Sequence, residues 1–65
     1  MGLEITVRRK FLSDQSPVFY IVLKNGDGQI EIPMDNRWDA EAVADELASG
    51  LRDTSVENVY RKNEF

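Results

Sequence analysis

The first group of side chains that could perform chemistry in this sequence is a run of acids. Five acids lie between residues 35 and 46, where Arg37 is the only base: Asp35, Asp39, Glu41, Asp45 and Glu46. Charge of a single sign attracts a basic partner and can imitate a phosphate backbone. The alternative interpretation is an ordinary solvated helix face. We expect Asp39, Glu41, Asp45 and Glu46 to be partner-binding residues.

The second group is basic and comes from the two ends of the chain. It comprises Arg8, Arg9, Lys10, Arg61 and Lys62. If the first and last strands are neighbours, these side chains, together with Tyr20 or Tyr60, would form a platform for single-stranded nucleic acid. The alternative is that they protect an edge strand from aggregation. Nucleic-acid-binding domains are usually net basic, whereas this chain has a net charge of −4, so nucleic acid is an alternative partner only.

Catalytic and metal-binding residue types are scarce. The chain has no His and no Cys, which excludes a thiol nucleophile, a disulfide and a Cys-ligated zinc. The segment Asn25-Gly26-Asp27-Gly28 resembles the middle of a calcium loop, but Leu23 and Met34 occupy positions where an EF-hand needs acids. A catalytic pair of carboxylates needs burial, whereas Glu41 and Asp45 are expected on a solvated helix face. We therefore expect no enzymatic activity, no metal and no cofactor.

Length and composition indicate the class of protein. A chain of 65 residues is long enough for one domain, residues 1–65. Its longest apolar run, Val18 to Leu23, is far too short to cross a membrane. The N-terminal residues lack the basic and then apolar layout of a secretory signal. We expect a cytoplasmic protein with no membrane partner.

Three strands are predicted in the first half of the chain. Residues 3–8 alternate apolar and polar, as a half-buried strand does. Residues 18–24 and 29–34 flank Asn25-Gly26-Asp27-Gly28, whose glycines favour a tight hairpin. With residues 25–28 as the loop, three apolar pairs fall on one face: Leu23 with Ile30, Ile21 with Ile32, and Phe19 with Met34.

A helix and a fourth strand are predicted in the second half. Asp39 is the expected N-cap, with Trp38 and Val43 as a hydrophobic staple. The helix has one apolar stripe and is expected to end at Gly50. The stripe consists of Ala40, Val43, Ala44, Leu47, Ala48 and Leu51. Residues 55–61 form the expected last strand.

These elements predict an α+β fold in the order β-β-β-α-β. The sheet is expected to be antiparallel, with the helix packed on one face, because a single helix covers one face only. The other face, with Val18, Tyr20, Val22 and Tyr60, would be open. An open face with aromatic side chains could form a weak homodimer, so we expect a monomer or such a dimer.

The segment from Phe19 to Met34, with its Glu31-Ile32-Pro33-Met34 strand end, resembles the small phage-encoded inhibitors of bacterial RNA polymerase. That family has an aromatic-led strand, a tight hairpin, an acidic helix and a closing strand with basic residues, here Arg61 and Lys62. Its members are not enzymes; they bind the polymerase and block productive initiation. The resemblance implies that Arg61 is a basic contact and that Glu41 and Asp45 belong to the acidic helix. We therefore expect Arg61 and Lys62 to be partner-binding residues as well.

The leading hypothesis is therefore a non-enzymatic interaction module. It would be an inhibitor of the phage type that docks its acidic helix on a basic surface of a larger protein or nucleoprotein complex. Inhibitors of CRISPR complexes share the same size, acidity and lack of Cys. The alternatives are a nucleic-acid-binding accessory protein that uses the basic group and a small assembly protein that oligomerises through its open sheet face.

Overall fold

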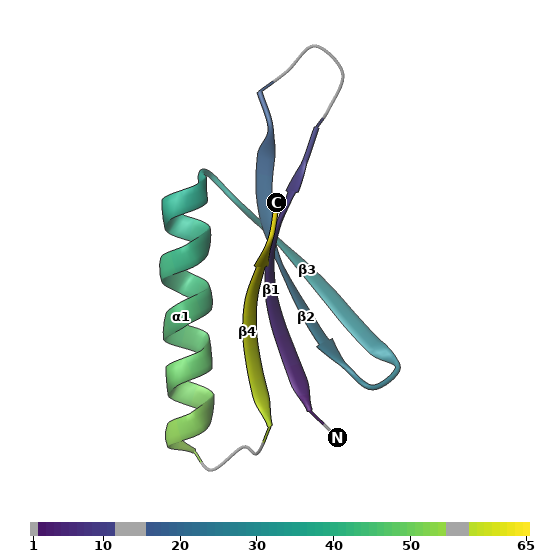
Figure 1. Ribbon diagram of the computed structural model, residues 1–65, viewed down its shortest axis with the longest axis vertical. Helices are drawn as coiled ribbons and strands as arrows, with labels where there is room; N and C mark the ends of the chain where they lie inside the picture. The colour runs from purple at the N-terminus through teal and green to yellow at the C-terminus, as the bar shows by residue number, and fades with distance from the viewer. Residues whose placement is uncertain (1, 12–15, 55–57) are drawn as a thin grey trace.

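The computed structural model describes residues 2–11, 16–54 and 58–65. The elements follow the order β1 (Leu3–Lys10), β2 (Val18–Asn25), β3 (Gly28–Met34), α1 (Arg37–Asp53) and β4 (Val59–Glu64). The strands form a four-stranded sheet in the order β3-β2-β1-β4, and α1 lies against one face of it (Figure 1). The predicted α+β class and the β-β-β-α-β order are confirmed.

The prediction of a purely antiparallel sheet is wrong, because β4 pairs in parallel with β1. The pairs β1–β2 and β2–β3 are antiparallel, so β3 runs in the same direction as β1. Helix α1 then carries the chain back along the sheet, and β4 repeats the direction of β3. A crossover helix of 17 residues is long enough to connect two parallel strands.

The predicted register of the hairpin is confirmed. Leu23 pairs with Ile30, Ile21 with Ile32, and Phe19 with Met34. The turn itself is shorter than the predicted loop, because residues 25 and 28 still pair and only residues 26 and 27 make the turn. Gly26 has a φ of 58°, in the left-handed region that glycine adopts without a steric cost.

The core lies between α1 and the inner face of the sheet. Its buried residues are Ile5, Val7, Ile21, Ala40, Ala44, Ala48 and Val59. Partly buried side chains surround them: Leu3, Phe19, Leu23, Ile32, Met34, Val43, Leu47 and Leu51. The whole predicted helix stripe therefore packs on the sheet. The exception on the sheet is Ile30, which is 62% exposed because the hairpin tip points away from α1 (Figure 1).

Helix α1 begins earlier than predicted, and its N-cap is Asn36, not Asp39. The Asp39 backbone N–H donates to Asn36 Oδ1 at 2.8 Å, and Asn36 Nδ2 donates to Asp39 Oδ2 at 3.1 Å. Asn is as good a capping residue as Asp, and this reciprocal pair satisfies both side chains. Trp38 is 77% exposed, so the predicted staple with Val43 does not form.

Helix α1 also ends later than predicted, because it continues through Gly50 to Asp53. The Thr54 backbone N–H donates to the carbonyl oxygens of Gly50 and Leu51, each at 3.2 Å. Leu51 packs against the core and so holds the last turn in place. The predicted last strand, residues 55–61, is shifted to Val59–Glu64; residues 55–57 of that prediction lie outside the described residues.

Candidate functional site

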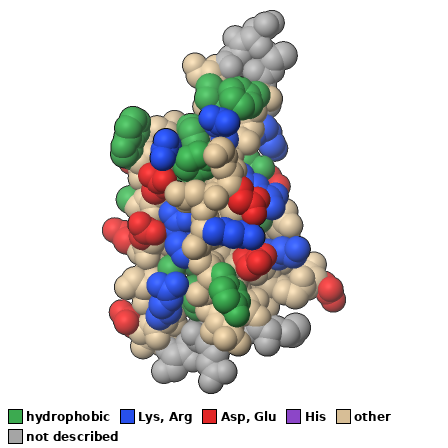
Figure 2. Space-filling model, in the orientation of Figure 1, with side chains coloured by type: hydrophobic (Ala, Val, Ile, Leu, Met, Phe, Trp, Pro, Cys, Tyr) green, Lys and Arg blue, Asp and Glu red, His purple; other side chains and the backbone are tan. Residues whose placement is uncertain are grey.

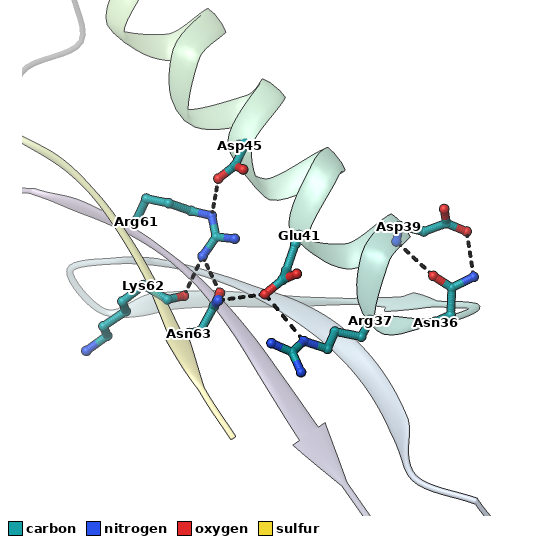
Figure 3. A network of polar contacts seen from close by, with 8 residues as sticks. All are labelled: Asn36, Arg37, Asp39, Glu41, Asp45, Arg61, Lys62 and Asn63. Carbon is teal, nitrogen blue, oxygen red and sulfur yellow. Dashed lines mark hydrogen bonds and ion pairs between the residues drawn. The ribbon is translucent and has the colours of Figure 1, made fainter.

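A continuous polar network joins helix α1 to strand β4 (Figure 3). Arg61 Nε lies 2.9 Å from Asp45 Oδ1, and Arg61 Nη1 donates to Asn63 Oδ1 at 2.6 Å. Asn63 Nδ2 donates to Glu41 Oε1 at 2.8 Å, and Arg37 Nε lies 3.5 Å from the same carboxylate oxygen. We call these five residues the α1–β4 network.

Strand register explains why the network forms. Arg61 and Asn63 pair with Ile5 and Val7 of β1, so their side chains share the inner face with the core. The Arg61 side chain is 14% exposed and the Glu41 side chain 27%. The Arg61 Nε–H bond does not point at Asp45, so that contact is an ion pair rather than a hydrogen bond.

The α1–β4 network gives a structural role to three of the residues predicted to bind a partner. Glu41, Asp45 and Arg61 come together as the sequence suggested, but they contact one another across the helix–sheet boundary. The expectation that Glu41 and Asp45 both project from a solvated helix face is wrong for Glu41, while the Asp45 side chain remains 70% exposed. These residues therefore hold α1 against β4 in the free protein.

The exposed side of α1 carries a separate line of acids. Asp39, Glu46 and Asp53 are seven residues apart and all three are exposed. Successive members of such a series lie about 10.5 Å apart along the helix axis, with a drift of about 20°. Glu46 lies about 200° around the helix from the buried Ala44, so the line faces away from the sheet. We call these three residues the outer acidic stripe.

The two bases of α1 are held away from this stripe. The guanidinium of Arg37 lies 4.6 Å from the centre of the Phe65 ring and also pairs with Glu41. Arg52 donates through Nη2 to the carbonyl oxygen of Val59 at 3.2 Å. Figure 2 shows acidic side chains along the left edge of the molecule, over α1. The outer acidic stripe therefore keeps its negative charge.

Sequence reasoning predicted two members of the outer acidic stripe and missed the third. Asp39 and Glu46 were expected to bind a partner, whereas Asp53 lay beyond the predicted helix end at Gly50. The repeat of an acid every seven residues was a usable signal, because residues seven apart lie on one side of a helix.

The predicted basic patch does not assemble, because its members lie on two faces of the sheet. Arg9 and Arg61 lie on the inner face, the same face as the core residues of their strands, while Arg8, Lys10 and Lys62 lie on the opposite, open face. The Arg9 guanidinium lies 4.7 Å from the Phe11 ring centre. The Lys10 ammonium lies 5.1 Å from the Tyr20 ring centre.

Acids pair with two of the three basic residues of the open face, Arg8 and Lys62. Arg8 Nε lies 3.0 Å from Glu64 Oε2, and Lys62 Nζ lies 3.1 Å from Glu64 Oε1 and 3.9 Å from Glu4. Contact with Lys62 lowers the pKa of the Glu64 carboxyl, desolvation opposes that effect, and the charge of Arg8 lowers the pKa further. The open face of β1 and β4 thus carries mixed charge, as Figure 2 also shows.

The predicted apolar contact on the open face is interrupted by these charges. Val22 is only 3% exposed, Val18 is 37% exposed and Tyr60 is 54% exposed. Tyr60 pairs with Glu4, and Tyr20 pairs with Arg8, so charged residues lie between the two tyrosines. A homodimer through this face would have to bury those ion pairs, which is costly.

Within residues 2–11, 16–54 and 58–65, no pocket and no cluster of potential metal ligands is found. No helix in that part of the chain is long and apolar enough to span a membrane. No family model, curated protein or solved structure compared with this chain matches it.

Proposed function

We propose that this chain is a non-enzymatic interaction module that docks the outer acidic stripe on a basic surface of a larger complex. The observation that carries the proposal is the stripe itself: Asp39, Glu46 and Asp53 lie in one line on the exposed side of a 17-residue helix. Negative charge in such an arrangement accelerates encounter with a basic surface and selects against acidic ones.

The α1–β4 network supports this proposal by fixing the helix that carries the stripe. Arg61 and Asn63 of β4 contact Asp45 and Glu41, one helical turn apart. The same network occupies Arg37, which would otherwise neutralise charge near the start of the helix. A binding face held on a rigid scaffold loses less conformational entropy when it meets its partner.

Nucleic acid is a weaker candidate than a basic protein surface. The basic group is divided between the two sheet faces, and two of its three open-face members, Arg8 and Lys62, are paired with Glu4 and Glu64. A nucleic-acid site needs a continuous basic groove that follows the phosphate backbone. The net charge of −4 also opposes association with a polyanion.

The resemblance to phage-encoded polymerase inhibitors suggests the first partner to assay. We propose purified bacterial RNA polymerase as the probe, with block of productive initiation in the cytoplasm as the biological outcome. The chain would act by occupying a basic surface of the enzyme.

Charge reversal on the stripe tests the proposal. The immobilised wild-type chain and the variant E46K/D53K are compared for capture of purified RNA polymerase and of proteins from a bacterial lysate. Glu46 and Asp53 are exposed, and among the described residues they make no ion pair or side-chain hydrogen bond. We expect a partner that the wild type captures and E46K/D53K loses by at least about tenfold, because two attractive charges become repulsive.

The matched control is N25K/D27K, which also replaces two exposed side chains by Lys but at the hairpin tip, far from α1. Capture by this control should equal capture by the wild type. If E46K/D53K and the wild type capture the same proteins equally, the stripe is a solvated helix face and the proposal is wrong.

A further inference from the structure

Strand β3 forms one edge of the sheet, and its N-terminal half is exposed. In the order β3-β2-β1-β4, β3 pairs only with β2 within the described residues. Gln29, Ile30 and Glu31 are exposed, and Ile30 keeps 62% of its surface in water because α1 does not reach the hairpin tip. An exposed edge with a large apolar side chain is a template for pairing with another strand.

Pro33 indicates which backbone groups of β3 point outward. Pro33 faces Tyr20 in the ladder but has no N–H, so its nitrogen must point away from β2. The two-residue turn leads to the same assignment. Gly28 closes the turn opposite Asn25 and directs its N–H and C=O toward β2, so the next residue, Gln29, directs its own groups to the free edge. Gln29 and Glu31, which precede Pro33 by four and two residues, therefore direct their N–H and C=O groups to the free edge.

A second copy of this chain matches this edge in one antiparallel register. With Ile30 opposite Ile30 of the second copy, Gln29 faces Glu31 and Glu31 faces Gln29. All outward N–H and C=O groups of these residues are then paired across the interface, with two hydrogen bonds on each side of the axis. The Gln29 side-chain amide can also donate to the Glu31 carboxylate of the second copy. The two Ile30 side chains meet at the axis on the side where each is now exposed.

Other registers of the same edge fit less well. With Glu31 at the axis, two carboxylates would lie directly opposite each other, which is destabilising. With Ile32 at the axis, Pro33 would face Glu31 and one hydrogen bond at each end would be lost because Pro has no donor. Pro33 and Glu31 therefore restrict pairing to residues 28–32.

We infer that the chain forms a two-fold dimer through the edges of β3, which makes a continuous sheet of two copies. The opposite edge is unsuited to this, because residues 61–64 of β4 are Arg, Lys, Asn and Glu and are engaged in the α1–β4 network and the open-face ion pairs. Charged edge strands resist pairing. The dimer leaves both copies of α1 free, so it is compatible with the proposed function and does not depend on it.

Substitution at Gln29 tests both the dimer and its register. Analytical ultracentrifugation of the full chain should show a concentration-dependent monomer–dimer equilibrium. Gln29→Glu places a carboxylate opposite Glu31 of the second copy at two symmetric sites, and should raise the dissociation constant by about tenfold. Gln29→Lys places an ammonium there and should lower it by a similar factor. A wild-type chain that stays monomeric up to millimolar concentration overturns the dimer, and equal responses to both substitutions overturn the register.

Cysteine cross-linking provides a second readout, because the chain has no Cys of its own. At the axis the two Cα atoms of residue 30 would be about 4.5 Å apart, which is within the range of a disulfide. Ile30→Cys should therefore form a covalent dimer under mild oxidation. Asp27→Cys is the matched control, because its two copies would lie about 20 Å apart along the strands. Equal cross-linking of both variants would mean random collision and would contradict the proposed interface.

Discussion

At the residue scale, the charges of this chain have two different roles. Arg61, Glu41 and Asp45 contact one another between α1 and β4, whereas Glu46 and Asp53 remain outside. The sequence shows all of these as one acidic helix with a base nearby. Strand register separates them, because alternation in β4 sends Arg61 inward and Lys62 outward.

Arg61→Ala should destabilise the fold by about 2 kcal/mol, because Asp45 and Asn63 lose a charged partner in a half-buried site. Lys62→Ala is the control, because its side chain is 48% exposed and exposed ion pairs contribute little. Urea unfolding of both variants measures the difference. Equal losses of stability would show that the α1–β4 network does not hold the helix in place.

The Glu64 carboxyl predicts a dependence of stability on pH. Its pKa is lowered from 4.5 by Lys62 and Arg8, so the ion pairs stabilise the folded state above that value and are lost as the pH falls through the lowered pKa. Glu64→Gln should therefore reduce the melting temperature near neutral pH and make no difference in acid. Thermal unfolding at both pH values checks this, and a difference that persists in acid would contradict it.

At the element scale, periodicity predicted what each segment is but not where the helix ends. The apolar stripe of α1 and the hairpin register follow from side-chain spacing, and both are confirmed. The helix ends depend on competition between neighbouring residues. Asn36 and Asp39 are both good caps, and Gly50 ends a helix only if nothing beyond it holds the next turn. Leu51 does so by packing on the core.

A pair of glycine substitutions tests this description of the elements. Gly50→Ala should stabilise the protein by about 0.5–1 kcal/mol, since Ala is the better residue inside a helix and a Cβ there would meet no atom within 4 Å beyond the adjoining backbone of its own helix. Gly2→Ala should destabilise it, because a Cβ there would lie 2.8 Å from the carbonyl oxygen of Asn58. Denaturant unfolding measures both, and a loss of stability in Gly50→Ala would indicate a left-handed cap at that residue.

The parallel pairing of β4 could not be read from side-chain patterns. A half-buried strand has the same alternation whether its neighbour is parallel or antiparallel. The crossover decides: helix α1 carries the chain back along the sheet, so β4 runs in the direction of β1 and β3, and it joins the free edge of β1. That placement also determines the candidate site, because it puts Arg61 and Asn63 under Glu41 and Asp45 (Figure 3).

At the scale of the whole molecule, the net charge of −4 is concentrated on the outer side of α1. On the open sheet face, Arg8 and Lys62 are balanced by Glu4 and Glu64. On the outer side of α1, the acids have no base among them. The two surfaces proposed for interaction, the outer acidic stripe and the β3 edge, lie on different sides of the molecule (Figure 1) and can be occupied together.

The most direct test of the central claim is capture of the partner at increasing salt, by the wild type, E46K/D53K and N25K/D27K. Charge-driven docking is strongest at low ionic strength, where screening is weakest. We predict that wild type and N25K/D27K capture the partner equally at low salt and lose it as salt rises, while E46K/D53K fails at every salt concentration. Equal capture by E46K/D53K and the wild type at low salt would contradict the account.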